Sequence, residues 1–576
     1  MPLRANTNHR PSLHRARIHL AQSEALTPLT LLGLLTGLLA GGLLIGFREL
    51  VVLVNDLLIP VGEENFERLA PELRFILPLL GSALLIVLFK LSPANRRQFG
   101  IAHVIERLTF NRGRLPVTNT VGQFISALIA LTSGFSVGRE GPAVHMGAGA
   151  GSIIGQRLNL PDNTLTSLAG CGTAAAISVS FNTPMAGVIF AMEVVMKEYT
   201  LGSFLPVMAA SVSAAFLSQM MYDSAPAFQI PLIPMPSMEE LIVSALTAFI
   251  IGALAAAFIR LNVLTVKTRG SRITLPLLSA GILMGATGLL LPEAMGIGYD
   301  TIEALLTGTE FNPGFMVILL TTKLILTAVV IGLGVPGGVI GPSLMIGAMA
   351  GTILGIFGDT VFGLSIVNIS FHTLVGMVAM MAAVLQAPLV ALITVLEMTR
   401  NPNIIMPAML AIVIACLTCS QLFRQRGLFD MQFLAQGIHP ELSPITRQLN
   451  KAGVASLMET QFETSVSIIQ TSQVKSLSKE WVIIEENHRF THAIYSTHIH
   501  KHNTSEDSLD LLSIPDCRPI QPISMQATLN DALSAMNRHS VDTLSVLTIH
   551  KKQRQKNKTL CGIITRETIE AFYQHK

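Results

Sequence analysis

The sequence predicts an all-α polytopic membrane domain followed by a small α/β domain, and three observations support this fold class. Half of the 576 residues are apolar and only 13% are charged, whereas soluble domains carry about 25% charged residues. The apolar part repeats itself once. After Phe423 the composition becomes polar and charged. We therefore expect an N-terminal segment 1–27, a transmembrane domain 28–435 and a C-terminal domain 436–576.

Long uncharged stretches recur through the apolar part. A membrane-spanning helix needs about 20 apolar residues, and stretches such as Leu324–Gly358 and Thr360–Leu396 exceed one span. Each of these must hold two helices or a broken one, so we expect roughly 10 to 18 membrane-embedded helices. Arginines and histidines crowd the first 23 residues, which predicts a cytoplasmic N-terminus. We expect the C-terminus to be cytoplasmic as well, and the short loops and modest length favour a bacterial plasma membrane protein.

The internal repeat has two spaced matches in the same order. Gly141–Gly155 lies over Gly341–Gly355, with eight of fifteen positions identical. Pro184 with Glu193 nine residues later lies over Pro388–Glu397, which has the same spacing. Transporters are often built from two such halves, with the substrate site between them at mid-membrane. The repeat therefore predicts a membrane transport domain of two halves.

A charged pair, Arg139 and Glu140, lies within a long uncharged region, where charge is costly and seldom without function. The Gly141-Pro142 that follows opens a helix, and a helix start presents free backbone N–H groups. The repeat supplies a second start after the glycine-rich segment 337–342. Two converging helix starts hold an anion without a lysine, weakly enough for release. A carboxylate at Glu140 would compete with that anion.

These residues resemble a known family. Gly138–Pro142 reads Gly-Arg-Glu-Gly-Pro, the signature of the CLC family of chloride channels and chloride/proton antiporters. Val335–Pro342 is similar to the second signature of the family, with Ile340 in place of a phenylalanine. The resemblance covers roughly residues 28–435. It implies inverted halves with broken helices, and a homodimer in the lipid bilayer with one pore per subunit.

The resemblance also implies site residues. Glu140 would be the gating glutamate, whose carboxylate occupies an anion site and leaves when it is protonated or displaced. Backbone amides around Arg139 and Gly141, and at Val339 and Ile340, would bind the anion. We expect chloride to be the transported ligand, with no enzymatic activity and no metal ion.

The sequence departs from the family pattern at the central anion site. Gly100 fits, but the anion-binding serine of the family aligns with Phe99, and a late tyrosine aligns with Phe429. Both hydroxyl donors are then absent, which predicts weaker halide binding or an apolar inner gate formed by the two rings. An alignment shifted by one residue would instead place Gln98 near the pore.

A third departure bears on proton coupling. Coupled members usually carry an internal glutamate as a proton relay, and here that position is Val194. We therefore favour a voltage- or pH-gated chloride channel, with a chloride/proton antiporter as the alternative. A fluoride exporter and a membrane sensor without ion flux are lesser alternatives.

Other polar residues in the apolar region have structural interpretations. We expect Glu193 and Glu397 to serve helix packing, and Lys323 to pair with an acid or a carbonyl. His103 and His145 lie near the predicted site and are interpreted as structural. Cys416 and Cys419 are interpreted as helix-packing sulfurs rather than a redox or metal pair.

The C-terminal region resembles a pair of CBS modules. Its strand–strand–helix order at residues 543–573 fits a second module, and residues 450–515 would form a degenerate first one. CBS pairs often bind adenine nucleotides through a Ser/Thr-x-x-Asp, but Thr565 is followed by Thr568. We therefore favour a structural or dimer-stabilising role over nucleotide binding. The basic run 551–558 is interpreted as a solvated loop, so no nucleic-acid partner is expected.

Overall fold

The computed structural model describes residues 17–18, 20–21, 25–58, 66–93, 97–222, 228, 237–307, 312–362, 369–438, 444–474, 476–486, 489–502, 508–549 and 558–574. Most of the predicted segment 1–27 and of the run 551–558 lie outside these ranges. The chain forms two compact units. One is helical and comprises residues 30–154 and 166–440, and the other comprises residues 1–29, 155–165 and 441–576.

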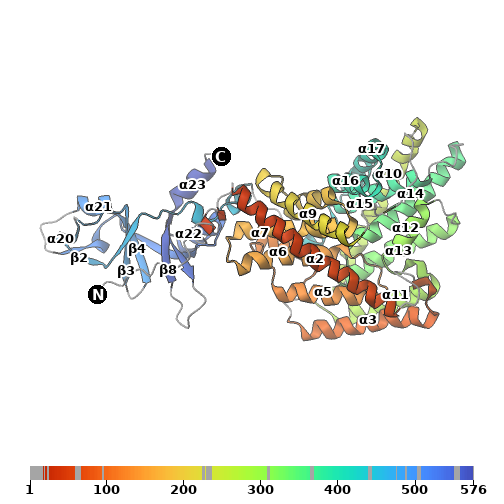
Figure 1. Ribbon diagram of the computed structural model, residues 1–576, viewed down its shortest axis with the longest axis horizontal. Helices are drawn as coiled ribbons and strands as arrows, with labels where there is room; N and C mark the ends of the chain where they lie inside the picture. The colour runs from red at the N-terminus through yellow and green to blue at the C-terminus, as the bar shows by residue number, and fades with distance from the viewer. Residues whose placement is uncertain are drawn as a thin grey trace. The chain divides into compact units, whose positions relative to one another are not determined.

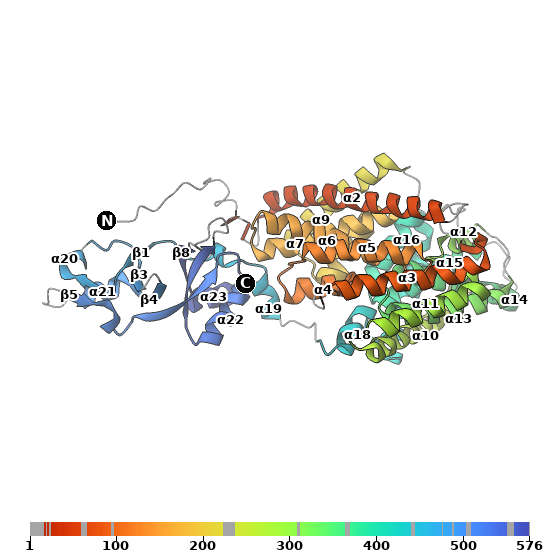
Figure 2. The same ribbon diagram turned by 90° about the horizontal axis from the view of Figure 1, so that it is seen from below.

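The helical unit is built from helices of uneven length (Figures 1 and 2), and most of them are apolar. Among the described residues, eight helices are long and apolar enough to cross a membrane, and five shorter apolar helices accompany them. The two stretches that exceed one span, 324–358 and 360–396, each hold more than one helix, as predicted. The helices are α2 (Leu26–Leu58), α3 (Pro71–Leu91), α4 (Gly100–Phe110), α5 (Val117–Thr132), α6 (Glu140–Arg157), α7 (Asp162–Phe181), α8 (Pro184–Phe190), continued by a π-helical turn η3 (Ala191–Met196), α9 (Leu201–Met221), α10 (Met238–Arg269), α11 (Thr274–Leu290), α12 (Tyr299–Leu306), α13 (Pro313–Leu333), α14 (Ile340–Phe362), α15 (Ile369–Leu385), α16 (Pro388–Thr399), α17 (Ile405–Leu417) and α18 (Leu428–Ala435).

The two repeated helix pairs form the centre of this unit. In α6 and α7, a Cβ on Gly147 would lie 2.2 Å from the carbonyl oxygen of Gly172. In α14 and α15, a Cβ on Gly347 would lie 2.4 Å from the carbonyl oxygen of Gly376. No side chain fits at such a distance, so glycine lets each pair of backbones touch. The same kind of glycine contact therefore joins the two helices of the pair within each half.

The two halves meet as an inverted pair. Gly138 donates its N–H to the Gly338 carbonyl at 2.7 Å, and Gly338 donates to the Gly138 carbonyl at 2.6 Å. The two segments run antiparallel at this bridge. Repeat-related residues share the rare left-handed conformation before α8 and α16, with φ of 55° at Asn182 and 52° at Gln386. This local twofold relation is what inverted repeats produce, which confirms the predicted architecture.

The second unit contains a six-stranded sheet in the order β1-β3-β4-β6-β7-β8. Two strand–helix–strand–strand–helix modules follow each other along the chain. In each, the first strand pairs parallel with the second, which pairs antiparallel with the third. This repetition fits the expected pair of CBS-like modules. The first module consists of β1 (Phe462–Ser465), α20 (Thr471–Val474), β3 (Trp481–Glu486), β4 (Arg489–Tyr495) and α21 (Ser496–Lys501). The second module consists of β6 (Arg518–Ser524), α22 (Leu529–His539), β7 (Thr543–Ile549), β8 (Lys558–Thr565) and α23 (Arg566–Gln574). The strands β2 (Ile468–Gln470) and β5 (Ser508–Asp510) form a separate pair, and α19 (Pro444–Asn450) precedes the first module.

Candidate functional site

The starts of α6 and α14 are brought into direct contact. A Cβ on Gly141 would lie 2.7 Å from the Gly338 Cα, and a Cβ on Gly338 would lie 2.6 Å from the Gly141 nitrogen. Only glycine allows this approach. The N–H groups of a first helical turn have no partner within their own helix, and each helix start carries about half a positive charge. The contact therefore concentrates partial positive charge at one buried place.

The Glu140 carboxylate lies at this place and is fully buried. Its Oε2 accepts a hydrogen bond from the Gly341 N–H at 3.3 Å, so the acid of one half reaches the helix start of the other half. Its Oε1 accepts a hydrogen bond from the Tyr299 hydroxyl at the beginning of α12. A carboxylate held by a backbone N–H and a hydroxyl occupies a position where a small anion would find the same donors.

Tyr299 is a site residue that the sequence reasoning missed. It lies in neither repeat match, and no local motif marks it. Its ring contacts a second site residue, because the Arg139 guanidinium carbon lies 5.4 Å from the ring centroid. Val339 and Ile340 are buried and directly precede Gly341. Both predicted anion-binding segments therefore lie at the Glu140 carboxylate, and Tyr299 is a further residue that contacts it.

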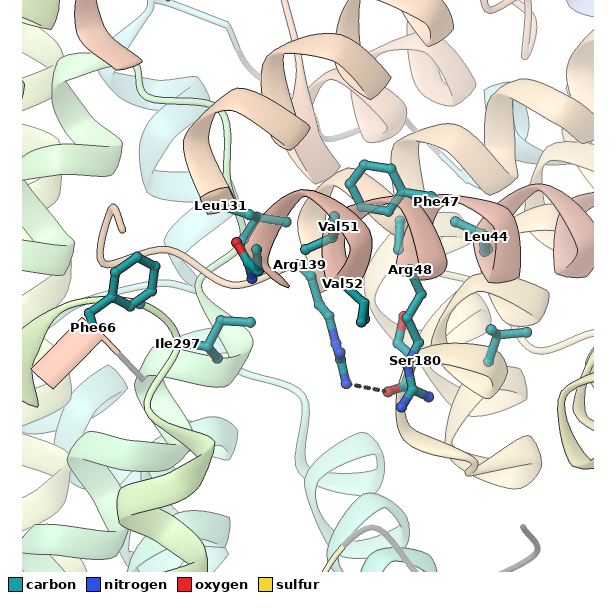
Figure 3. A pocket seen from close by; sticks show the side chains of 14 residues that line it. Leu44, Phe47, Arg48, Val51, Val52, Phe66, Leu131, Arg139, Ser180 and Ile297 are labelled. Atoms are coloured by element: carbon teal, nitrogen blue, oxygen red, sulfur yellow. Dashed lines mark hydrogen bonds between the residues drawn. The ribbon is translucent and has the colours of Figure 1, made fainter. Parts of the chain in front are cut away.

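A pocket lies beside Arg139, between α2, the start of α6 and the end of α7. Figure 3 shows Arg48 and Arg139 directed into it, with Phe47 and Val51 on the α2 side. Arg139 donates to the Ser180 carbonyl at 3.5 Å, the dashed contact in Figure 3. The two guanidinium groups make this pocket electropositive. One of them belongs to Arg139, which directly precedes Glu140 in the chain.

The start of α4 is enclosed by polar side chains. The Gly100 N–H donates to Gln123 Oε1 at 2.8 Å and also faces His145 Nδ1 at 3.2 Å. The Phe99 ring stacks on Phe89, with centroids 5.4 Å apart, and its centroid lies 6.2 Å from that of His145. The helix start predicted for the central anion site is therefore present, and Phe99 packs against neighbouring helices.

Phe429 is buried at the start of α18. Among the described residues, the aromatic neighbours of the Phe99 ring are Phe89 and His145, and Phe429 is not one of them. The structure thus does not bring the two predicted gate rings into contact. Whether they close the pore together stays a prediction.

The two repeat-related glutamates cap helices of the opposite half. Glu397 accepts hydrogen bonds from the Met185 and Ala186 N–H groups at 3.0 and 2.7 Å, at the start of α8. Glu193 accepts from the N–H groups of Leu389 at 3.3 Å and Val390 at 2.8 Å, at the start of α16. Both acids therefore have a structural role. Val194 beside Glu193 is buried and apolar.

Lys323 is fully buried in α13 and binds backbone carbonyls, as predicted. Its Nζ donates to the carbonyls of Ala294 at 3.1 Å, Met295 at 3.4 Å and Gly296 at 2.8 Å. Three carbonyl oxygens at one turn solvate the ammonium where water is absent. The lysine thus fixes the turn that leads into α12 and Tyr299.

Two further expectations concern sites outside the helix starts. In the part of the chain that the structure describes, no group of three metal-ligating side chains is found. Cys416 and Cys419 are free thiols in helices. In the C-terminal unit, Thr565 Oγ1 and Thr568 Oγ1 lie 2.8 Å apart, where an acid would contact a ribose in the CBS pattern.

Comparisons with known proteins agree with this geometry. The chain is 29% identical to a ClcB-like chloride channel protein of Ralstonia nicotianae over 55% of this chain and 76% of that protein. It is 29% identical to the H(+)/Cl(-) exchange transporter ClcA of Salmonella arizonae over 53% of this chain and 66% of the exchanger, just under two thirds of it. A crystal structure of a eukaryotic CLC transporter matches with a TM-score of 0.62 and 17% identity, covering 97% of this chain and 98% of that one.

Residues 79–420 match the family described as voltage gated chloride channel. This segment contains both helix starts, the capping glutamates and Tyr299, and it amounts to more than half of the chain. The protein is an integral membrane protein, and it belongs to the voltage-gated chloride channel (CLC) family.

Proposed function

We propose that the protein carries chloride across the membrane through the paired starts of α6 and α14, with Glu140 as the gate. The contact of Glu140 Oε2 with the Gly341 N–H supports this proposal most directly. The carboxylate occupies the donors that a chloride ion would use. Protonation removes the negative charge of the carboxylate. The side chain then competes less well with chloride for these hydrogen-bond donors, and it leaves the site.

The pocket lined by Arg48 and Arg139 would serve as the entrance. Guanidinium groups attract anions, and a site near but not on the helix starts raises the local anion concentration without trapping the ion. The Gly341 donor is a backbone N–H rather than a charged side chain. Binding to it is therefore weak enough for release on the time scale of transport.

A second candidate function is coupled chloride/proton exchange. It is favoured by the identity to an H(+)/Cl(-) exchange transporter. Val194 argues against it, because valine cannot carry a proton at the position of the usual internal acid. The two functions share the anion path and Glu140, and they differ only in whether protons move in a fixed ratio to chloride. A fluoride exporter would use the same helix starts.

We further propose a homodimer with one pore per subunit, cytoplasmic termini, and a bacterial plasma membrane location. The C-terminal unit would have a structural role rather than bind adenine nucleotide, because Thr568 stands where an acid is needed. Native mass spectrometry of the detergent-solubilised protein tests the dimer, and titration with ATP tests the nucleotide expectation.

Simultaneous recording of chloride and proton movement in reconstituted vesicles tests the function. We expect chloride efflux from wild-type vesicles that rises as the pH falls, and faster efflux without this pH dependence for Glu140→Gln. Proton movement driven by a chloride gradient would identify the exchanger, and a fluoride electrode would identify fluoride export. An absence of anion flux from the vesicles would leave the membrane sensor as the remaining candidate function. An unchanged pH profile for Glu140→Gln would contradict the gate.

A further inference from the structure

Two buried polar side chains on one face of α13 contact the segments that carry the gate residue and its hydroxyl partner. Lys323 and Thr327 are fully buried. They lie four residues apart, so they share one face of the helix. Lys323 contacts the turn before Tyr299, and Thr327 contacts the segment before Glu140. One helix face therefore touches both segments that form the hydrogen bond between Tyr299 and Glu140.

The Lys323 contact fixes the backbone directly before α12. Its Nζ donates to the carbonyl oxygens of Ala294, Met295 and Gly296, and the bond to Gly296, at 2.8 Å, is the shortest of the three. Gly296 lies three residues before Tyr299. A buried ammonium without acceptors is costly, so the three carbonyls are held toward Nζ. The start of α12, and with it the Tyr299 hydroxyl, is therefore fixed relative to α13.

The Thr327 contact fixes the segment before α6. Its Oγ1 lies 2.7 Å from the Ser136 Oγ, and both residues are fully buried. Ser136 lies four residues before Glu140. The two segments also bond to each other, because Gly296 donates its N–H to the Gly134 carbonyl at 3.2 Å. The turn before α12 and the segment before α6 are therefore joined both directly and through α13.

The bond between the Tyr299 hydroxyl and the Glu140 carboxylate depends on these contacts. The two residues are 159 positions apart in the chain, so packing alone sets the geometry between them. A hydrogen bond weakens steeply when its distance or angle departs from the optimum. A small shift of either segment would therefore weaken the bond without unfolding the helices.

We propose that Lys323 and Thr327 are positioning residues for the gate. Through the two segments, they place the Tyr299 hydroxyl within hydrogen-bonding distance of the Glu140 carboxylate. Their contacts keep the carboxylate at the helix starts at neutral pH, and so they slow the passage of chloride. The inference rests on the proposed function of Glu140 as the gate, and it gives the polar face of α13 a part in gating.

Chloride efflux from vesicles at neutral pH tests this role. Lys323→Met keeps a long side chain but removes its donors, so the turn is released and the hydroxyl bond to Glu140 weakens. We expect efflux to rise by about two- to tenfold, the factor that corresponds to one net hydrogen bond. Thr327→Val removes the bond to Ser136 and should act in the same direction. Thr327→Ser restores the hydroxyl and should return efflux to the wild-type rate.

Combined variants separate positioning from a general loss of packing. In Tyr299→Phe protein the hydroxyl bond is already absent, so adding Lys323→Met should raise efflux no further. In Glu140→Gln protein the gate itself is absent, so adding Lys323→Met should not change the rate. Thr373→Val is the matched control for Thr327→Val, because it removes a buried hydroxyl pair of the same length, formed with Thr352. It should leave efflux unchanged.

Wild-type efflux from folded Lys323→Met and Thr327→Val proteins would overturn the inference, and so would an equal increase in the Tyr299→Phe background. If Lys323→Met does not fold, the comparison of Thr327→Val with Thr327→Ser decides alone. In each of these cases, faster efflux from Glu140→Gln than from wild type would leave the proposed function intact. Equal efflux from Glu140→Gln and wild type would overturn the proposed gate, and this inference with it.

Discussion

At the scale of single residues, the proposed chloride gate is one carboxylate, Glu140, with two hydrogen-bond partners. Glu140 could be predicted from the sequence, because a charge beside a Gly-Pro helix start in an uncharged region is too costly to persist without a function. The sequence also predicts that Lys323 pairs with an acid or a carbonyl, since a buried ammonium needs acceptors. The structure shows carbonyls. Tyr299 and Gln123 could not be predicted, because their contacts arise only when distant segments pack together.

Removing the Tyr299 hydroxyl should open the gate. Tyr299→Phe deletes one hydrogen bond to a charged group, and such bonds contribute about 1.5–3 kcal/mol. The carboxylate should leave its place more easily, so chloride efflux at neutral pH should rise by about tenfold or more. Tyr222→Phe is the matched control, because Tyr222 donates to Glu49 instead. Equal efflux from Tyr299→Phe and wild-type vesicles would show that the hydroxyl does not hold the gate.

Restoring a hydroxyl at the predicted central site should strengthen halide binding. Phe429→Tyr adds one donor to a buried ring at the start of α18, and a net hydrogen bond contributes about 0.5–1.5 kcal/mol. We expect bromide affinity by calorimetry to improve by about two- to tenfold. Phe433→Tyr, on the same helix, should leave the affinity unchanged. Phe99→Ser should act in the same direction. No gain from either change would argue against the alignment of these residues with the family donors.

At the scale of elements, the repeat is expressed as reciprocal contacts between the two halves. The broken helices were predictable from Gly-Pro starts, and the two halves from spaced matches. The exchange by which Glu193 and Glu397 each cap a helix of the other half was not predicted. Identical spacing in both halves was the available signal, but spacing alone cannot show which helix start an acid reaches.

Neutralising either capping acid should lower stability and leave ion coupling unchanged. Glu193→Gln and Glu397→Gln each weaken a carboxylate at a helix N-terminus, an interaction of about 0.3–2 kcal/mol. The repeat predicts similar losses for the two variants, seen as lower melting temperatures in detergent. The ratio of protons to chloride in vesicles should stay that of the wild type. A changed ratio for Glu193→Gln alone would identify that residue as a relay.

The glycine contact between α6 and α7 should not tolerate a side chain. A Cβ on Gly172 would lie 1.9 Å from the Gly147 carbonyl oxygen, so Gly172→Ala must push the helices apart at a cost of about 1–3 kcal/mol or more. We expect a lower melting temperature and a lower yield of folded protein. Gly46→Ala, where nothing lies within 4 Å, is the control and should be neutral or slightly stabilising. Equal melting temperatures for the two variants would contradict this packing.

At the scale of the whole molecule, the membrane unit and the C-terminal unit differ in composition. The first has long uncharged stretches, and the second is polar and charged. The uncharged stretches and the compositional change after Phe423 were sufficient to predict a polytopic helical unit and an α/β unit. Helix pairs inside one stretch were also predictable, because length limits a single span. The inverted relation of the halves required the resemblance or the structure, since self-similarity in sequence carries no orientation.

The proposed anion site is built from both halves together. Neither the segment at Glu140 nor the one at Gly341 forms it alone, because the acid belongs to one half and the N–H to the other. This is why local motifs identified the parts but not their contact. The central claim is therefore that an anion and the Glu140 carboxylate exclude each other between the two helix starts.

Anomalous diffraction from bromide-soaked crystals of Glu140→Gln and of wild-type protein tests that claim most directly. We predict a bromide peak in the variant within contact of the Gly341 N–H and the Tyr299 hydroxyl, and no peak at that place in the wild type at neutral pH. A variant that transports bromide in vesicles but shows no peak between the two helix starts would contradict the claim.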